Sequence, residues 1–382
     1  MKIDLKKIIL DRKIIILLLI FIVIFVVIFV LISNSNKIGK EISDIEVTEP
    51  EKEVIIKEIE KTKKIIDDPI KFPALSNKGD AIYYQNFKDG FFYKLDLSSG
   101  LNKKISREIR MISDVIWSPD KSKAIFLVKQ DNYFFEKFNS PFKNANLEDG
   151  SYTYWFYDFS NDFIKKIGDE NINKISWSPD NVHILYHYLN ITDLVISGSI
   201  SILNPYEEKW TIVKENITND YNFGFIDSEN IFLLWQPTFD DFECDIPTLI
   251  NLKTKNESNL IDQNFCFVNI SINPKSKWGI YSDISVDGFI NINTKDSFNF
   301  DFGPSNIPSE YSYSNDGKYY YGFKNGSNLN DIYKIDLEEK RVKSILKTSE
   351  QISDSEQIII SPDEKYVYFL LDQYLYQTEI IK

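Results

Sequence analysis

The chain carries two hydrophobic patterns, one continuous and one broken into short runs. From Ile14 to Ile32, nineteen consecutive residues are Ile, Leu, Val or Phe, close to the ~20 apolar residues that a helix needs to cross a bilayer. Beyond about residue 62, the apolar residues come in short runs rich in Ile, Phe and Tyr, separated by Pro, Gly, Asn and Asp. Runs of this kind are typical of strands joined by tight turns. The sequence therefore predicts one transmembrane helix followed by an all-β domain.

One block recurs throughout the second part: an apolar strand, then Ser-Pro-Asp or a variant, then another strand. In a clear copy, Trp117-Ser118-Pro119-Asp120 leads into the apolar run 124–127. We call the Ser of each copy, or the residue in its place, the anchor residue. The seven anchor residues are Ser76, Ser118, Ser178, Asp227, Asn273, Ser314 and Ser361. They are separated by 42, 60, 49, 46, 41 and 47 residues.

The residues of the block suit a tight hairpin, because Pro presets φ for the first corner and Asp can bond its own backbone two residues on. We assign this structural role to Ser118, Pro119, Asp120, Ser178, Pro179, Asp180, Ser361, Pro362 and Asp363. Most blocks are followed by a third strand ending in Asp or Asn, and then by room for a fourth. Four antiparallel strands per ~45 residues, repeated seven times, predict a β-propeller over residues 62–382.

The block also resembles a known family. Trp-Ser-Pro-Asp between two strands, with a later strand ending as in Asp96-Leu97-Ser98-Ser99-Gly100, is similar to the repeat of TolB-like (WD40-like) propellers. The resemblance implies the propeller fold and a binding role. TolB has six blades, so the resemblance makes six the alternative to the seven blades counted here. This chain departs from TolB in having the apolar N-terminal run and no room for TolB's small α/β domain, so TolB's partners are not carried over.

The charges beside the predicted transmembrane helix set its orientation. Basic residues precede the span, so the N-terminus is expected in the cytoplasm. Those bases are Lys2, Lys6, Lys7, Arg12 and Lys13. The expected organisation is a cytoplasmic tail (1–13), a span in contact with the lipid bilayer (14–32), a stalk (33–61) and an extracytoplasmic propeller. Ser33 to Lys37 are not the small residues of a signal-peptidase site, so cleavage is not expected.

The end of the stalk allows two interpretations. Thr48-Glu49-Pro50-Glu51 can begin a short helix. Alternatively, part of Val54 to Ile70 is a strand that completes the last blade, since the chain ends at Lys382 after only three strands of that blade. An uncovered edge strand invites aggregation, and we therefore predict a ladder between residues 54–70 and 373–380.

The sequence contains no recognisable catalytic motif. It lacks a Gly-x-Ser-x-Gly elbow, a phosphate loop, His-Glu-x-x-His, Cys-x-x-Cys and a dinucleotide glycine pattern, so no catalytic, cofactor or metal residue is assigned. The only histidines, His183 and His187, are expected on one strand and too far apart to share a metal. The net charge of −13 disfavours nucleic acid as a partner.

Two features remain as candidates for contact chemistry. A long connection between residues 129 and 150 contains the aromatic residues Tyr133, Phe134, Phe135, Phe138 and Phe142, which either hold a partner or pack onto a neighbouring blade. Cys244 and Cys266 fall in connections on the same face of the ring, so outside the cell they can form a disulfide. Two free buried thiols are the alternative.

Taken together, these observations favour a membrane-anchored, non-catalytic propeller that binds a protein or a cell-envelope polymer. The alternative is a propeller hydrolase or lyase with its site at the channel mouth, since such enzymes need leave no linear motif. A cluster of His, Asp, Glu or Arg at the mouth would favour the enzyme. A mouth of Asn, Ser and aromatic residues would favour binding.

Overall fold

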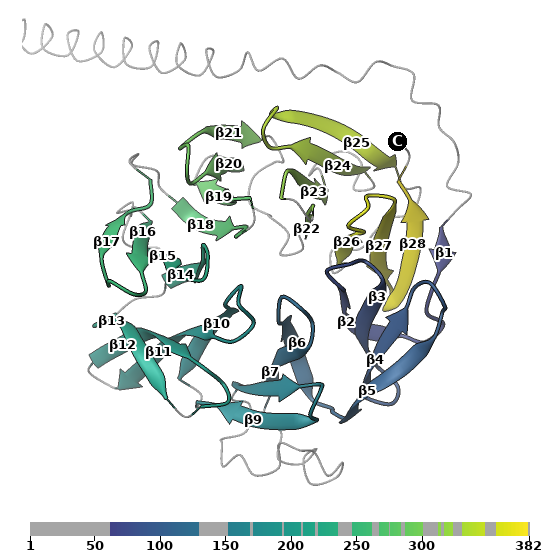
Figure 1. Ribbon diagram of the computed structural model, residues 1–382, viewed down its shortest axis with the longest axis horizontal. Coiled ribbons are helices and arrows are strands. Elements are labelled where there is room, and N and C mark those ends of the chain that lie inside the picture. The colour runs from purple at the N-terminus through teal and green to yellow at the C-terminus, as the bar shows by residue number, and fades with distance from the viewer. Residues whose placement is uncertain are drawn as a thin grey trace, which may run out of the picture. The chain divides into compact units, whose positions relative to one another are not determined.

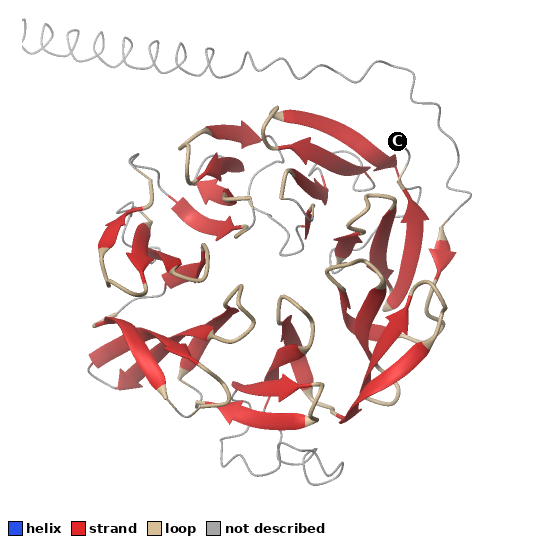
Figure 2. Cartoon of the chain, viewed as in Figure 1, coloured by secondary structure: helices blue, strands red, loops and turns tan. Residues whose placement is uncertain are grey.

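The alternating pattern beyond residue 62 folds into strands throughout the described part of the chain (Figure 2). The computed structural model describes residues 62–129, 152–168, 171–192, 195–207, 209–217, 221–235, 247–261, 267–274, 276–283, 287–300, 312–314, 317–323, 331–347 and 357–380. Within these ranges there is no helix of the length and apolarity that a bilayer crossing requires. The predicted tail, transmembrane helix and stalk, residues 1–61, lie outside them.

Seven sheets of four antiparallel strands form the blades of a β-propeller, which confirms the predicted fold and the count of seven over six (Figure 1). Blade 1 consists of β2 (Ile70–Leu75), β3 (Ala81–Asn86), β4 (Phe91–Asp96) and β5 (Asn102–Glu108). Blade 2 consists of β6 (Ile112–Trp117), β7 (Lys123–Lys129), β8 (Tyr152–Asp158) and β9 (Phe163–Ile167). Blade 3 consists of β10 (Ile172–Trp177), β11 (Ile184–Thr192), β12 (Val195–Leu203) and β13 (Trp210–Glu215). Blades 4 and 5 are β14 (Tyr221–Phe225), β15 (Asn230–Trp235), β16 (Thr248–Asn251), β17 (Glu257–Asn259); β18 (Phe267–Ile272), β19 (Trp278–Asp283), β20 (Asp287–Asn291), β21 (Ser297–Phe300). Blades 6 and 7 are β22 (Ser312–Tyr313), β23 (Tyr319–Phe323), β24 (Asp331–Asp336), β25 (Arg341–Lys347); β26 (Ile358–Ile360), β27 (Tyr366–Leu371), β28 (Tyr374–Glu379), β1 (Lys63–Lys64).

The first strand after each blade-to-blade connection is the inner strand, nearest the middle of the ring (Figure 1). Six of the seven anchor residues follow their inner strand directly, and Asp227 follows β14 after one further residue, Ile226, so the repeated block forms the hairpin between the first and second strands. Because neighbouring strands are antiparallel, these hairpins all lie at one end of the ring. We call this end the turn face.

The core consists of apolar clusters at the seven boundaries between blades. Strand β7 shows why, since its side chains alternate between its two faces. Phe126 and Val128 join the cluster shared with blade 1, whereas Ile125 joins the cluster shared with blade 3. A blade therefore buries both of its faces only when a neighbour stands on each side.

The predicted ladder between the stalk end and the last strand is confirmed. Strand β1 pairs with β28, with Lys63 opposite Gln377 and Lys64 opposite Tyr376. The pairing continues as a hydrogen bond of 3.0 Å from Ile65 N to Leu375 O. Residues 54–61 lie outside the described part, so the strand is described only at its C-terminal end.

The turns between third and fourth strands share a strained position. Four residues after the Asp or Asn that ends the third strand, φ is positive in five blades. The residue there is Gly100, Asp162, Lys255, Lys295 or Lys340. Only glycine adopts this left-handed conformation without a steric penalty. The repeat thus explains Gly100 and marks the other four as substitutions that the fold tolerates.

We expect Ile66→Ala to lower the free energy of unfolding by about 2–5 kcal/mol, the usual range for deleting a buried Ile side chain. Ile66 is buried in the cluster that joins blades 7 and 1. The exposed neighbour Lys63 provides the control, since Lys63→Ala should change stability by less than about 0.5 kcal/mol. Urea unfolding of both variants measures the difference, and equal stabilities would show that this segment does not help to close the ring.

We expect Lys255→Gly to raise the free energy of unfolding by about 0.5–1 kcal/mol, because it relieves the left-handed conformation at φ 61°. The reciprocal change is Gly100→Lys, at φ 69° with no heavy atom within 4 Å of the added Cβ. It should destabilise by a similar amount. Calorimetric melting of the two variants checks the pair, and shifts of the same sign would contradict the shared turn geometry.

Candidate functional site on the inner wall

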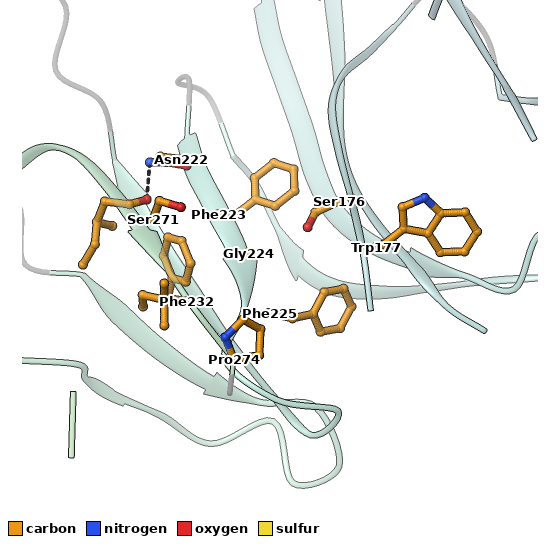
Figure 3. A pocket seen from close by; sticks show the side chains of 11 residues that line it. Ser176, Trp177, Asn222, Phe223, Gly224, Phe225, Phe232, Ser271 and Pro274 are labelled. Atoms are coloured by element: carbon orange, nitrogen blue, oxygen red, sulfur yellow. Dashed lines mark hydrogen bonds between the residues drawn. The ribbon is translucent and has the colours of Figure 1, made fainter. Parts of the chain in front are cut away.

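The inner strands of blades 3, 4 and 5 frame a cavity of about 330 Å³ (Figure 3). Its lining residues are Ser176 and Trp177 on β10; Asn222, Phe223, Gly224 and Phe225 on β14; Phe232 on β15; and Ile270, Ser271, Ile272 and Pro274 on or just after β18. Strand β14 supplies four of them and lies between the other two inner strands, so the cavity is centred on the inner strand of blade 4.

Alternation along β14 determines what the cavity contains. Phe223 and Phe225 pack in the cluster shared with blade 3. On the other side of the strand, the amide Nδ2 of Asn222 donates a hydrogen bond of 2.8 Å to Ile270 O on β18. Gly224 lies opposite Phe232, whose ring comes within 2.9 Å of where a Cβ would stand. The glycine thus lets the Phe232 ring reach the cavity.

Tryptophan hydrogen bonds join neighbouring inner strands on the side of blade 3 away from the cavity. Trp177 Nε1 donates to Ile116 O of blade 2 at 2.9 Å, and Trp117 Nε1 donates to Phe72 O of blade 1 at 3.1 Å. The two tryptophans of the Trp-Ser-Pro-Asp copies therefore connect the inner strands of blades 2 and 3 each to the preceding blade. Blades 4 and 5 have Ile226 and Ile272 at this repeat position, and an Ile side chain cannot make the same bond.

The cavity combines apolar surface with small uncharged polar groups. Ser271 is exposed and Ser176 half-buried. Among the described residues, neither hydroxyl group has a hydrogen-bond partner. No lining residue carries an ionisable side chain. Hydroxyl groups both donate and accept hydrogen bonds, whereas an unpaired charge would lack compensation here. The site is thus suited to an uncharged group with hydrogen-bonding capacity.

The turn residues assigned from the sequence make contacts typical of turns. The Ser118 hydroxyl accepts a bond of 3.0 Å from Lys123 N and donates one of 2.8 Å to Asp120 Oδ1. Ser361 is arranged in the same way, accepting from Tyr366 N and donating to Asp363. None of these residues lines the cavity.

The two histidines occupy different environments. His183 precedes β11 instead of lying on it, and its Nδ1 is 2.7 Å from Asp180 Oδ2. His187 lies within β11 and is buried. The described residues include no group of three or more His, Cys, Asp or Glu side chains placed to hold a metal ion. The candidate partner residues Tyr133, Phe134, Phe135, Phe138 and Phe142, and the pair Cys244 and Cys266, lie outside the described ranges.

Among the described residues, carboxylates with lowered pKa values lie in turns and at blade boundaries. Hydrogen bonds from Arg107 and from Tyr157 hold the pKa of Asp162 below its ordinary value, and the Arg107 side chain links blade 1 to blade 2 at 3.0 Å. Burial raises the pKa of Asp180, but hydrogen bonds from His183 and the Val182 backbone outweigh it, so the net change is downward. These shifts therefore belong to the scaffold.

Sequence reasoning missed Ser176, Ser271 and Asn222. A signal for two of them was present, because Ser176 and Ser271 stand two residues before their anchor residues Ser178 and Asn273. At the same repeat position Ile116 and Ile359 are apolar. Ser312 of blade 6 is also polar at this repeat position but does not line the cavity, so this signal alone does not single out the site. Only the folded ring shows that blades 3 and 5 bring Ser176 and Ser271 to one cavity.

Comparison with known proteins supports the fold alone. No protein-family model matches the sequence, and no curated protein does. Among solved structures, an oligogalacturonate lyase in complex with manganese is 11% identical, with a TM-score of 0.59 over 84% of this chain and 93% of that one. The oligogalacturonate lyase of Vibrio parahaemolyticus is 9% identical, with a TM-score of 0.61 over 84% and 94%. A prolyl endopeptidase is 12% identical, with a TM-score of 0.54 over 83% of this chain but only 49% of its own.

Asp96 gives a prediction for acid unfolding. Hydrogen bonds from Ser98 and Ser99 lower its pKa to about 2, whereas an unfolded Asp titrates near 4. Its ionised form therefore adds stability above about pH 4, and this contribution disappears as the pH falls towards 2. Asp96→Asn should flatten the loss of stability over this window. Asn251→Asp, at the equivalent turn of blade 4, should steepen it. Urea unfolding between pH 2 and 5 measures both slopes, and unchanged slopes would contradict the assignment.

Proposed function

We propose that the chain is a single-pass membrane protein whose extracytoplasmic propeller is a non-catalytic binding module for a protein or cell-envelope polymer. The observation that carries the proposal is the cavity on the inner strands, which offers hydroxyl, amide and aromatic groups and no ionisable side chain. The apolar run 14–32 and the bases before it support the anchor and its orientation. The resemblance of the repeat to TolB-like propellers supports a scaffold role.

The chemistry of the cavity favours binding over catalysis. A hydrolase or lyase needs groups that move protons or stabilise developing charge near the reacting atoms. Ser176 and Ser271 have no base or acid beside them in the lining, so neither has the partner that activates a nucleophile. Uncharged polar groups beside aromatic surface are instead what orients a bound ligand in an apolar pocket.

A propeller enzyme is the alternative, and the two lyase structures that cover 84% of this chain are the observation in its favour. At identities of 9–11%, these structures share the fold with this chain, and their activity does not follow from the likeness. Incubating the full chain with oligogalacturonate and Mn²⁺ discriminates between the two functions. Formation of an unsaturated uronide product would replace the binding proposal with a lyase.

We expect Ser271→Tyr to abolish capture of the partner, because a bulky side chain at the rim of the cavity blocks entry. The matched control is Ser113→Tyr, an equally exposed position on inner strand β6 of blade 2, outside the cavity. Crosslinking and affinity purification from intact cells should recover the same proteins or polymer with the natural chain and with Ser113→Tyr, but not with Ser271→Tyr. Equal recovery from both variants would place the binding site elsewhere.

A further inference from the structure

The inner edge of β14 has unused backbone hydrogen-bonding capacity. β14 pairs with β15 on one side and, among the described strands, with nothing on the other. Ile226 N donates to Asn230 O at 2.8 Å, which marks that pair as hydrogen-bonded. Hydrogen-bonded pairs recur every second residue in an antiparallel ladder. The pairs Gly224 with Phe232 and Asn222 with Leu234 are then hydrogen-bonded as well.

The intervening residues direct their backbone groups the other way. Tyr221, Phe223 and Phe225 therefore point N–H and C=O groups away from β15. Tyr221 confirms this direction, because its carbonyl oxygen accepts a bond of 3.2 Å from Lys174 Nζ on β10. No hydrogen bond within the described ranges reaches the outward backbone groups of Phe223 or Phe225. These two residues offer two donors and two acceptors in a row.

The free edge lies directly beside the cavity, because Phe223 and Phe225 belong to its lining (Figure 3). Alternating donors and acceptors along one strand edge match the backbone of an extended peptide, which pairs with an exposed strand by β-strand addition. The adjoining cavity of about 330 Å³ can hold a bulky side chain of that peptide. Its lining has no ionisable group, so an uncharged side chain fits and a charged one pays the cost of desolvation.

We propose that β14 receives an extended peptide segment of the partner by strand addition, with one uncharged side chain in the cavity framed by Trp177, Phe225 and Ser271. The proposal rests on the proposed binding function and names the ligand class for the same site. The exposed Ser271 hydroxyl lies at the rim, where it can bond the peptide backbone. Recognition then depends on backbone N–H and C=O groups repeating at the spacing of a strand, which a carbohydrate does not have.

The test is a peptide array read with the full chain in detergent. The probes are pentapeptides Ser-Thr-Xaa-Thr-Ser with randomised flanking residues and each of the twenty amino acids at Xaa, each synthesised also with N-methylated Xaa and Thr amides. Phe, Leu, Met and Trp at Xaa should bind at least tenfold more tightly than Asp, Glu, Lys and Arg. N-methylation should weaken the binding of the best peptides at least tenfold, because it removes the N–H groups that donate to the backbone carbonyl oxygens of β14.

Ser271→Tyr should remove binding to the array, whereas Ser113→Tyr should retain it. Circular dichroism melting of both variants verifies that they fold, and Ser271→Ala, which leaves the cavity open, should retain the preference at Xaa. Binding that tolerates N-methylation, or an array without preference at Xaa, overturns strand addition. Binding of chitotriose or maltotriose that Ser271→Tyr abolishes, with no peptide binding, would overturn the peptide and leave the binding function standing. If Ser271→Tyr changes the binding of none of these ligands, both the peptide proposal and the binding function of this cavity are overturned.

Discussion

The apolar contact between neighbouring blades is the constraint on which the remaining structure depends. Each blade is apolar on both faces, as the opposite destinations of Ile125 and Phe126 on β7 illustrate. Such a sheet is stable only between two others, because an uncovered face would leave aromatic and β-branched side chains in water. A row of blades always has two uncovered ends, and a ring has none. Closure is therefore a requirement of the packing, and the β1–β28 ladder beside the cluster of Ile66, Ile70 and Leu375 provides it.

Closure also assigns a mechanical role to the N-terminal side of the domain. Strand β1 comes directly after the predicted stalk in the sequence, so the chain that leads to the predicted anchor is the same chain that completes blade 7. A two-residue ladder is a weak attachment by itself. The buried side chains of Ile66 and Ile70 that follow it supply the apolar contact that holds this segment in place.

The candidate site arises where the repeat departs from its own rule. Most copies put apolar residues on the inner strand, and two put tryptophans that bond the preceding blade. Blade 4 has Ile226 where those two copies have tryptophan, and its neighbours contribute Ser176 and Ser271. Gly224, which admits the Phe232 ring, and the two serines bring space and hydrogen-bonding groups together. A binding surface in a repeat protein is thus expected where the copies differ.

The sequence by itself determined the all-β class, the seven blades and the hairpin at each anchor residue, and it allowed the pairing of the stalk end with the last strand as one of two interpretations. These features are local or periodic: turn residues act within a few positions, and a missing fourth strand can be counted. Only the tertiary structure decided which of the residues that differ between copies of the repeat lie close together in space. Ser176 and Ser271 are 95 residues apart in the chain, and what brings them to one cavity is the order of blades around the ring. The direction of the free backbone groups on β14 likewise depends on the register of its pairing with β15. A hydrophobic pattern specifies which face of a strand is buried, but not which hydrogen bonds its other edge leaves open.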